Sequence, residues 1–318
     1  MKDHPNIILI MTDTQGVNAV GCYGRPELKT PCLDGMAEDG IRFDRAYTCQ
    51  PVCGPARAAL FTGNWPHTNG VLANNIPLGG NIRTVGERLT DNGYHSAYIG
   101  KWHVDGTDYF GNGKCPPGWD PEYWYDGRNY LEELTDEERL RWRKELHTAE
   151  GVHKYNMTAD FTWAHRIGNR AVDFLEKFSA DDAPFFLVVS YDEPHGPFTC
   201  PPPYCDMFAD FEYEVGPAAH DSLEDKPAHQ RDWAQPLPAD QDTIKNPMYF
   251  GCNSFVDDEI GRVLNAAEKH APEALVIYTS DHGTPLKAHG LGSKGPAMYD
   301  DTTRVPFIVK WQGRAPAG

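Results

Sequence analysis

Acidic, basic and imidazole side chains follow the ends of several short aliphatic runs in this 318-residue chain. Asp13 comes directly after the run 6–12, and the other groups in such positions are Lys101, His103, His195, Asp281 and His282. Those five follow the runs 94–100, 185–191 and 274–279. Because ligands of an open α/β sheet bind outside the carboxyl ends of its strands, we expect these acids and bases to converge on one site.

The segment Cys53-Gly54-Pro55-Ala56-Arg57 could supply a nucleophile. A cysteine just before a proline in the first turn of a helix lies where backbone N–H groups and the helix dipole favour negative charge. Arg57, one turn further on, would add a fixed cation with forked donors. Taken alone, the pattern also fits a buried thiol beside a surface arginine, so its meaning depends on the groups around it.

Asp13, Asp281 and His282 could bind a metal ion. A carboxylate and an imidazole side by side either ligate a metal or form the hydrogen bonds of a turn. Three such groups on two strand ends, facing one helix N-terminus, favour a metal site over three unrelated turns.

The elements that must position these residues alternate along the chain. Short aliphatic runs alternate with helical stretches, which predicts an α/β fold: a large, mostly parallel mixed sheet flanked by helices. Strands are expected at 6–12, 94–100, 185–191, 274–279 and 305–311. Helices are expected at 31–39, 55–61, 84–92, 135–147, 158–178 and 248–270. Thr135 and Glu138 predict a capping box at the start of one of them.

Two segments, 105–130 and 196–247, show neither helical nor strand periodicity. Long loops inside a compact domain are usually functional, so both are expected to shape the entrance to the site. The first is rich in aromatic residues, namely Trp119, Tyr123, Trp124 and Tyr125. These rings could line the approach for a sugar or an aryl group, or they could simply pack the loop.

Composition narrows the possible partners. A formal net charge of −17 argues against nucleic acid and anionic membranes, which need clustered Lys and Arg. No stretch approaches the roughly 18 apolar residues of a membrane helix, and no cleavage site follows the first aliphatic run, so we expect a cytoplasmic chain. In that compartment the eight cysteines should be reduced, mostly buried thiols.

Six segments together resemble the successive signatures of the type I sulfatase family of the alkaline-phosphatase-like superfamily. They lie at 6–13, 53–63, 100–103, 194–195, 279–283 and 294–306. The family fold is a large mixed sheet flanked by helices, followed by a small C-terminal sheet subdomain. The resemblance therefore implies that residues 1–318 are a sulfatase catalytic domain, truncated at its C-terminal end and without that subdomain.

The resemblance also implies a mechanism. Cys53 would be converted by a formylglycine-generating maturation enzyme to an aldehyde, whose geminal diol attacks sulfur and later expels sulfate. Asp13, Asp281, His282 and residue 53 would hold one divalent ion, with Ca²⁺ first and Mn²⁺ or Mg²⁺ as alternatives. The remaining family roles fall on Arg57 (support of the diol), Lys101, His195 and Lys294 (sulfate oxygens and leaving alcohol), His103 (base) and Asn74 (a further contact to the metal or sulfate).

Departures from the family pattern leave alternatives open. Thr14 stands where many members carry a second Asp. Relatives with a single early Asp include phosphonate monoester hydrolases and choline-sulfatase-like enzymes. Ala56 replaces a Ser that is frequent in the modification motif. Sulfate ester hydrolysis is the first reading, phosphonate or phosphate ester hydrolysis is the second, and an unmatured non-catalytic relative is the third. The acidic surface favours a small sulfated substrate over a polysulfated polymer. The sequence does not fix the oligomeric state.

Overall fold

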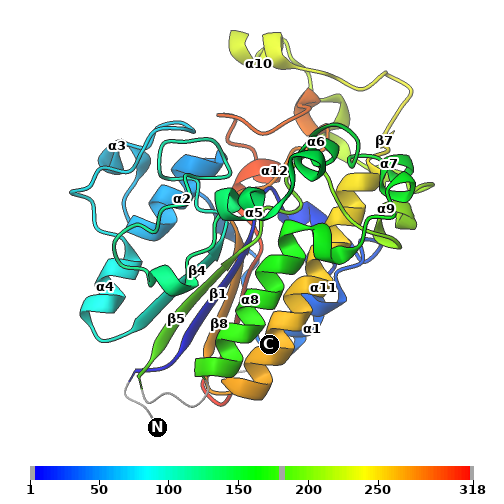
Figure 1. Ribbon diagram of the computed structural model, residues 1–318. Helices are drawn as coiled ribbons and strands as arrows, with labels where there is room; N and C mark the ends of the chain where they lie inside the picture. The colour runs from blue at the N-terminus through cyan, green and yellow to red at the C-terminus, as the bar shows by residue number, and fades with distance from the viewer. Residues whose placement is uncertain (1–3, 179–182, 316–318) are drawn as a thin grey trace.

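The computed structural model describes residues 4–178 and 183–315, and in that part of the chain a six-stranded mixed sheet lies at the centre (Figure 1). The strand order is β2-β10-β8-β1-β5-β4. The strands of this sheet are β1 (Ile7–Thr12), β2 (Ile41–Arg42), β4 (His95–Gly100), β5 (Phe185–Ser190), β8 (Leu275–Ser280) and β10 (Phe307–Lys310). Two small two-stranded sheets pair β3 (Ala46–Tyr47) with β9 (Arg304–Val305) and β6 (Tyr213–Glu214) with β7 (Thr243–Ile244).

Parallel pairing brings four strand ends to one edge of the sheet. β1 is central and runs parallel to both β5 and β8, and β4 runs parallel to β5. Thr12 pairs with Ser280, and Gly100 pairs with Ser190. Because these pairs close their ladders at the same level, the residues that follow each strand emerge side by side. Only β2 and β10 bring antiparallel pairing into this described sheet.

Both faces of the sheet are buried, which explains why its strands are continuous aliphatic runs. Along β1, Ile8 and Ile10 pack into the core formed with α8 and α11. Leu9 and Met11 point to the other face and pack with Phe61 of α2. This alternation follows from the two-residue repeat of a strand.

Helices form the outer layers. Figure 1 shows α8, α11 and α1 on one side of the sheet and α2 and α4 on the other, whereas α10 projects above the sheet. The α-helices of the described chain are α1 (Pro31–Asp39), α2 (Cys53–Thr62), α3 (Pro66–Asn69), α4 (Val85–Asp91), α5 (Gly127–Glu133), α6 (Asp136–Lys144), α7 (Ala149–Lys154), α8 (Trp163–Phe178), α9 (Tyr204–Met207), α10 (Ala228–Trp233), α11 (Pro247–His270) and α12 (Asp300–Thr303). Short 3-10 helices lie at Val17–Ala19, Gly21–Tyr23, Pro121–Tyr123, Ala159–Phe161, Pro217–His220 and Ala288–Gly290.

The predicted α/β fold is confirmed, and four of the five predicted strands agree with the structure to within one residue at each end. The fifth, 305–311, divides into β9 and β10 because Pro306 lies between them and has no N–H to donate. The helix predicted at 158–178 begins only at Trp163, after a 3-10 turn. The capping box of Thr135 and Glu138 is present, with bonds in both directions.

Trp119, Trp124 and Tyr125 of segment 105–130 pack into the protein interior, and the partly buried Tyr123 packs against the core, so the interpretation that these four rings line the approach to the site is wrong. Trp119, Trp124 and Tyr125 are buried. The ring of Trp124 lies 5.4 Å from that of Tyr98 and 5.9 Å from that of Trp102, measured between centroids. Large apolar rings gain more from this burial than from a place at a solvent-filled entrance.

The thiols and the helices give two further observations. All eight cysteines lie within the described residues as free thiols, and four of them are buried. Of the described helices, none combines the length and the apolar character needed to cross a membrane.

Glu193 follows β5, and its buried carboxyl lies against the first turn of α8. Its Oε1 accepts a hydrogen bond of 3.2 Å from the backbone N–H of Ala164, while Oε2 has no partner among the described residues. Burial, together with the neighbouring Asp192 carboxylate, raises the pKa of Glu193 to about 8. The neutral acid is therefore the form that the fold accommodates at and below neutral pH.

We predict that Trp124→Ala destabilises the protein by about 3–5 kcal/mol, because it leaves a cavity among packed aromatic rings. Trp65→Ala is the matched control, since Trp65 is 61% exposed and Trp124 only 8%. Urea unfolding should show a lowered midpoint for the first variant and little change for the second. Equal midpoints for Trp124→Ala and the parent protein would refute the core assignment.

We predict that Glu193→Gln reduces the loss of folding stability that accompanies a rise in pH, because the variant has no carboxyl to ionise at this buried position. A carboxyl whose pKa is higher in the folded chain favours folding when protonated, so stability falls as pH rises from about 4.5 towards 8. The parent protein should lose on the order of 2–4 kcal/mol more than the variant between pH 5 and pH 9. Denaturant unfolding at both pH values measures this difference, and Glu273→Gln, on an exposed carboxylate, should behave like the parent.

Candidate active site

Cys53 is the first residue of α2 and is almost fully buried. The side chain of the N-cap residue, Val52, makes no hydrogen bond to the backbone N–H groups at the start of α2. The backbone N–H of Gly54 instead donates a 2.8 Å bond to Oδ1 of Asn74. Asn74 is thus brought next to Cys53, where it caps the helix. Its predicted contact to a metal or to sulfate remains a prediction.

Arg57 is fully buried one turn into α2 and binds both carboxylates of the site. Its Nε lies 2.8 Å from Oδ2 of Asp281, and its Nη2 lies 3.3 Å from Oδ2 of Asp13. Its Nη1 also donates to the backbone carbonyl of Lys101 at 2.6 Å and to the Ser190 hydroxyl at 2.8 Å. The guanidinium therefore joins the ends of all four parallel strands.

The pairing of Arg57 leaves the Oδ1 atoms of the two carboxylates to face Cys53 and His282. The Oδ1 of Asp13 lies 3.6 Å from the Cys53 Sγ and 3.7 Å from the His282 Nε2. The Oδ1 of Asp281 lies 3.6 Å from the same Nε2, which in turn lies 3.3 Å from the sulfur. Asp13, Cys53, Asp281 and His282, the four predicted metal ligands, therefore come together in one buried cluster.

This donor set fits a divalent ion. The Nδ1 of His282 lies 2.8 Å from the backbone carbonyl oxygen of Gly283, which can only accept, so the proton belongs on Nδ1 and the lone pair of Nε2 faces the cluster. Two carboxylate oxygens, one such nitrogen and an oxygen at position 53 would form an oxygen-rich site of the kind that Ca²⁺, Mn²⁺ and Mg²⁺ prefer.

Lys101 and Lys294 place positive charge on Asp13 from two sides. The buried ammonium of Lys101 lies 2.8 Å from Oδ2 of Asp13, and that of Lys294 lies 3.4 Å from Oδ1. Burial alone would raise the pKa of Asp13, but these two lysines hold it well below its usual value. Lys294 also lies 3.0 Å from the Cys53 Sγ and 3.0 Å from the Thr14 hydroxyl.

The two remaining predicted bases border the cluster. His103 is buried next to Cys53, and its Nδ1 has no hydrogen-bond partner among the described residues. Burial, with Lys101 adding to it, lowers the pKa of His103, which favours a neutral imidazole. His195 is 21% exposed, and its Nδ1 lies 3.8 Å from Oδ1 of Asp192.

Sequence reasoning missed two residues of the site. Asp192 binds Lys101 at 2.7 Å and stands near His195, so it connects two of the predicted groups. As an acid two residues past a strand, it carried the same signal as Asp13. Tyr109 lies with its ring centroid 5.2 Å from the Lys101 Nζ and 5.5 Å from the His195 ring. Nothing in its local sequence distinguished it from other loop aromatics.

A hollow of about 420 Å³ opens beside the cluster and contacts Thr14, His195 and Lys294. Segment 196–247 contributes to its walls from both ends, through Gly196 and Phe198 and through Ile244 and Lys245. This volume lies in the range of small-molecule sites.

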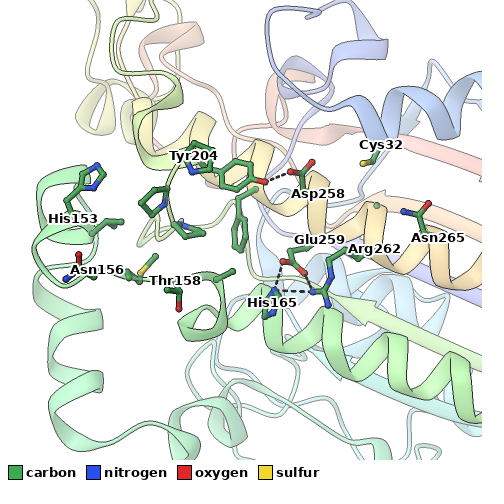
Figure 2. Close-up of a pocket in the computed structure, with 18 residues that line it drawn as sticks. Cys32, His153, Asn156, Thr158, His165, Tyr204, Asp258, Glu259, Arg262 and Asn265 are labelled. Atoms are coloured by element: carbon green, nitrogen blue, oxygen red, sulfur yellow. Dashed lines mark hydrogen bonds and ion pairs between the residues drawn. The ribbon is translucent and has the colours of Figure 1, made fainter.

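Figure 2 shows a larger groove of about 910 Å³, which contains none of the predicted site residues. It lies between α8 and α11 and the segments around α7 and α9. The labelled side chains of His165, Glu259 and Arg262 bind one another on one wall, and Tyr204 binds Asp258. We assign the active site to the smaller hollow, because Lys294 and Thr14 in its wall contact Cys53 and Asp13 of the cluster.

Comparison with known proteins agrees with this geometry. A family model described as Sulfatase matches residues 5–317. A protein of Escherichia coli strain K12, described as uncharacterized sulfatase YidJ, is 54% identical over 310 residues, which are 96% of this chain and 62% of that protein. The chain therefore spans less than two thirds of that relative.

Solved structures share the fold. The crystal structure of yidJ from Bacteroides fragilis aligns with a TM-score of 0.75 at 25% identity and covers 100% of this chain and 70% of its own. A phosphonate monoester hydrolase of Agrobacterium radiobacter aligns with a TM-score of 0.70 at 22% identity, covering 97% of this chain and 68% of its own. With the family model matching nearly the whole sequence, and with Cys53 set among two aspartates, a histidine and two lysines, the chain belongs to the sulfatase family.

Proposed function

We propose that the protein hydrolyses a sulfate ester of a small molecule, with a formylglycine made from Cys53 as its nucleophile. The observation that carries the proposal is the position of Cys53. Its side chain lies at a helix N-terminus, within 3.0–3.6 Å of a lysine, a histidine and a carboxylate oxygen. A thiol would end as a dead-end thiosulfate ester, whereas the hydrated aldehyde keeps a second hydroxyl with which to expel sulfate.

The protein's own groups divide into those that orient and those that meet the substrate. Arg57 and Lys101 are fully buried and fix the Oδ2 atoms of the aspartates. Lys294 and His195 are 17% and 21% exposed and face the hollow. We assign to Lys294 the neutralisation of a sulfate oxygen and to His195 the protonation of the leaving alcohol.

Three groups keep the remaining family roles. Lys101, through its ion pair with Asp13, helps to balance the negative charge of the sulfate. Neutral His103, with its free Nδ1, accepts the proton from the second hydroxyl at position 53 as sulfate leaves. Asn74 holds the N-terminus of α2 in place and presents its amide next to the sulfate.

A divalent ion, Ca²⁺ first and Mn²⁺ or Mg²⁺ as alternatives, would be held by Asp13, Asp281, His282 and residue 53. It would supply Lewis acidity and a counter-charge for the sulfate oxygens.

Phosphonate or phosphate ester hydrolysis is the second candidate. Thr14 favours it, because its hydroxyl donates a 2.6 Å bond to Asp13 Oδ1 where many family members place another carboxylate. The fold shared with the Agrobacterium radiobacter phosphonate monoester hydrolase is compatible with either chemistry. Both anions are tetrahedral, so cations placed as they are here would suit either.

We predict that the protein, co-expressed with a formylglycine-generating enzyme, hydrolyses aryl sulfates with a higher kcat/KM than the paired aryl phosphonate esters. Cys53→Ala should lower kcat/KM roughly 10³-fold or more, since it removes the nucleophile. Cys49→Ala is the control, because this half-buried thiol lies outside the cluster.

A clear preference for phosphonates would favour the second candidate. Intact-mass analysis of the Cys53 peptide tests the third possibility, an unmatured relative. Conversion lowers the mass by the difference between sulfur plus two hydrogens and one oxygen. An unmodified thiol in protein from the native host would make the chain a non-catalytic relative.

We predict that chelation abolishes both activity and metal content. Elemental analysis should find about one divalent ion per chain before EDTA treatment, and re-addition of Ca²⁺, Mn²⁺ or Mg²⁺ should show which ion restores turnover. His282→Ala should weaken metal binding roughly 10²-fold or more, as it removes one of the four ligands. His220→Ala, which removes only an exposed partner of Asp242, should bind metal like the parent. Full turnover after complete metal removal would contradict the assignment.

A further inference from the structure

The hollow beside Cys53 has an unusual charge for this protein. The chain carries a formal net charge of −17, and 46 of its residues are Asp or Glu. Yet no Asp or Glu occurs among the described residues that line the hollow. The basic residues in its walls are His195, Lys245, Lys287 and Lys294. Among the described residues of its walls, every Lys, Arg, His, Asp or Glu is thus a basic one, and such a pocket in a strongly acidic protein suits an anion.

Lys245 and Lys287 supply more positive charge than binding of a single sulfate group requires. Lys294 is engaged with the cluster through Asp13 and Cys53. Lys287 donates only to neutral oxygens of Gln235, to the backbone carbonyl at 3.2 Å and to Oε1 at 3.1 Å. No described carboxylate lies within ion-pair distance of it. Lys245 has a single partner, Glu212 at 3.6 Å, in a pair that is 55% exposed on both sides.

The backbone holds Lys287 in place at a conformational cost. Leu286, Lys287 and His289 have φ angles of 47°, 74° and 55°, which side-chain-bearing residues rarely adopt. Leu286 and Ala288 are buried on either side of the lysine. His289 is fixed by Asp221 at 2.8 Å and by stacking on Tyr299. The turn therefore presents the ammonium from a rigid base.

We propose that Lys287, assisted by Lys245, binds a second anionic group of the substrate, next to the sulfate ester that is cleaved. The substrate is then a small dianion, such as a sugar that carries one scissile sulfate and either a second sulfate or a carboxylate. This inference rests on the proposed function and makes Lys287 a residue that determines specificity. The alternative is a purely structural role, in which Lys287 only holds Gln235 of segment 196–247 against the turn through its hydrogen bonds.

The test compares three substrates of the matured protein: a monosulfated neutral sugar, the same sugar with a second sulfate, and a monosulfated uronic acid. At least one dianion should have a higher kcat/KM than the neutral sugar sulfate. In Lys287→Gln the kcat/KM for the preferred dianion, divided by that for the neutral sugar sulfate, should fall roughly 10- to 100-fold. The fall should come mainly from a higher KM for the dianion, as expected for loss of a charged hydrogen bond. Lys287→Arg should restore much of this ratio. The dianion that shows this dependence identifies the second group as sulfate or carboxylate.

Two controls separate binding from fastening. Gln235→Ala removes the side-chain bond to Lys287 but keeps the charge, so it should retain the dianion preference. Lys310→Gln removes a lysine at the opposite end of the sheet, paired with Asp39, and should also retain it. If Gln235→Ala mimics Lys287→Gln, or if Lys287→Gln leaves the ratio unchanged, the subsite is overturned.

A binding measurement distinguishes this proposal from the proposed function. Titration calorimetry on Cys53→Ala gives the Kd of each intact ester without turnover. If the matured protein hydrolyses no sulfate ester but dianion binding still depends on Lys287, the proposed reaction fails and the subsite stands. If no dianion binds more tightly than the neutral sugar sulfate, the subsite is wrong whatever the reaction.

Discussion

The contact of the buried Arg57 guanidinium with two aspartates organises the whole site. It takes the Oδ2 atom of Asp13 and of Asp281 and leaves both Oδ1 atoms turned towards Cys53 and His282. A buried ion pair is a poor source of net stability, because desolvation offsets most of the attraction. Losing one partner is nevertheless costly, since a bare charge remains in the interior. The cluster is thus best understood as a device for orientation.

The same contact connects the four parallel strands of the central sheet. Arg57 reaches the ends of β1, β4, β5 and β8 at once, through Asp13, the Lys101 carbonyl, Ser190 and Asp281. Parallel pairing at matched register is what makes such a reach possible. A slip of one residue in any of these strands would turn the following side chain to the other face and break the cluster. The continuous aliphatic strands and the polar site are therefore two results of the same register.

Most of this could be predicted from the sequence because the signals are local. The aliphatic runs predicted the parallel strands almost to the residue, and an acid or base after each run indicated where side chains would meet. The division of the last predicted strand follows from Pro306, which has no N–H to donate to a neighbouring strand. The aromatic residues Trp119 and Trp124 could not be placed, because a ring in an irregular loop has the same local sequence whether it faces solvent or packs under a sheet. Tyr109 could not be predicted for the same reason, and the local sequence of Lys287 does not indicate that it lines the same hollow as Lys294.

The distribution of charge bears on which anions can reach the site. At physiological ionic strength, charges on the acidic outer surface are screened over about 8 Å, so their repulsion is felt mainly by ligands that spread across that surface. Within the hollow, the lysines and His195 act at contact distance and with less water around them, so local attraction outweighs the distant surface charge. A polyanion would have to lie along the acidic exterior as well as enter the hollow. A small dianion would meet the lysines and His195 of the hollow without lying along that exterior, so under the proposed function we expect this charge distribution to favour a small anion over a polymer.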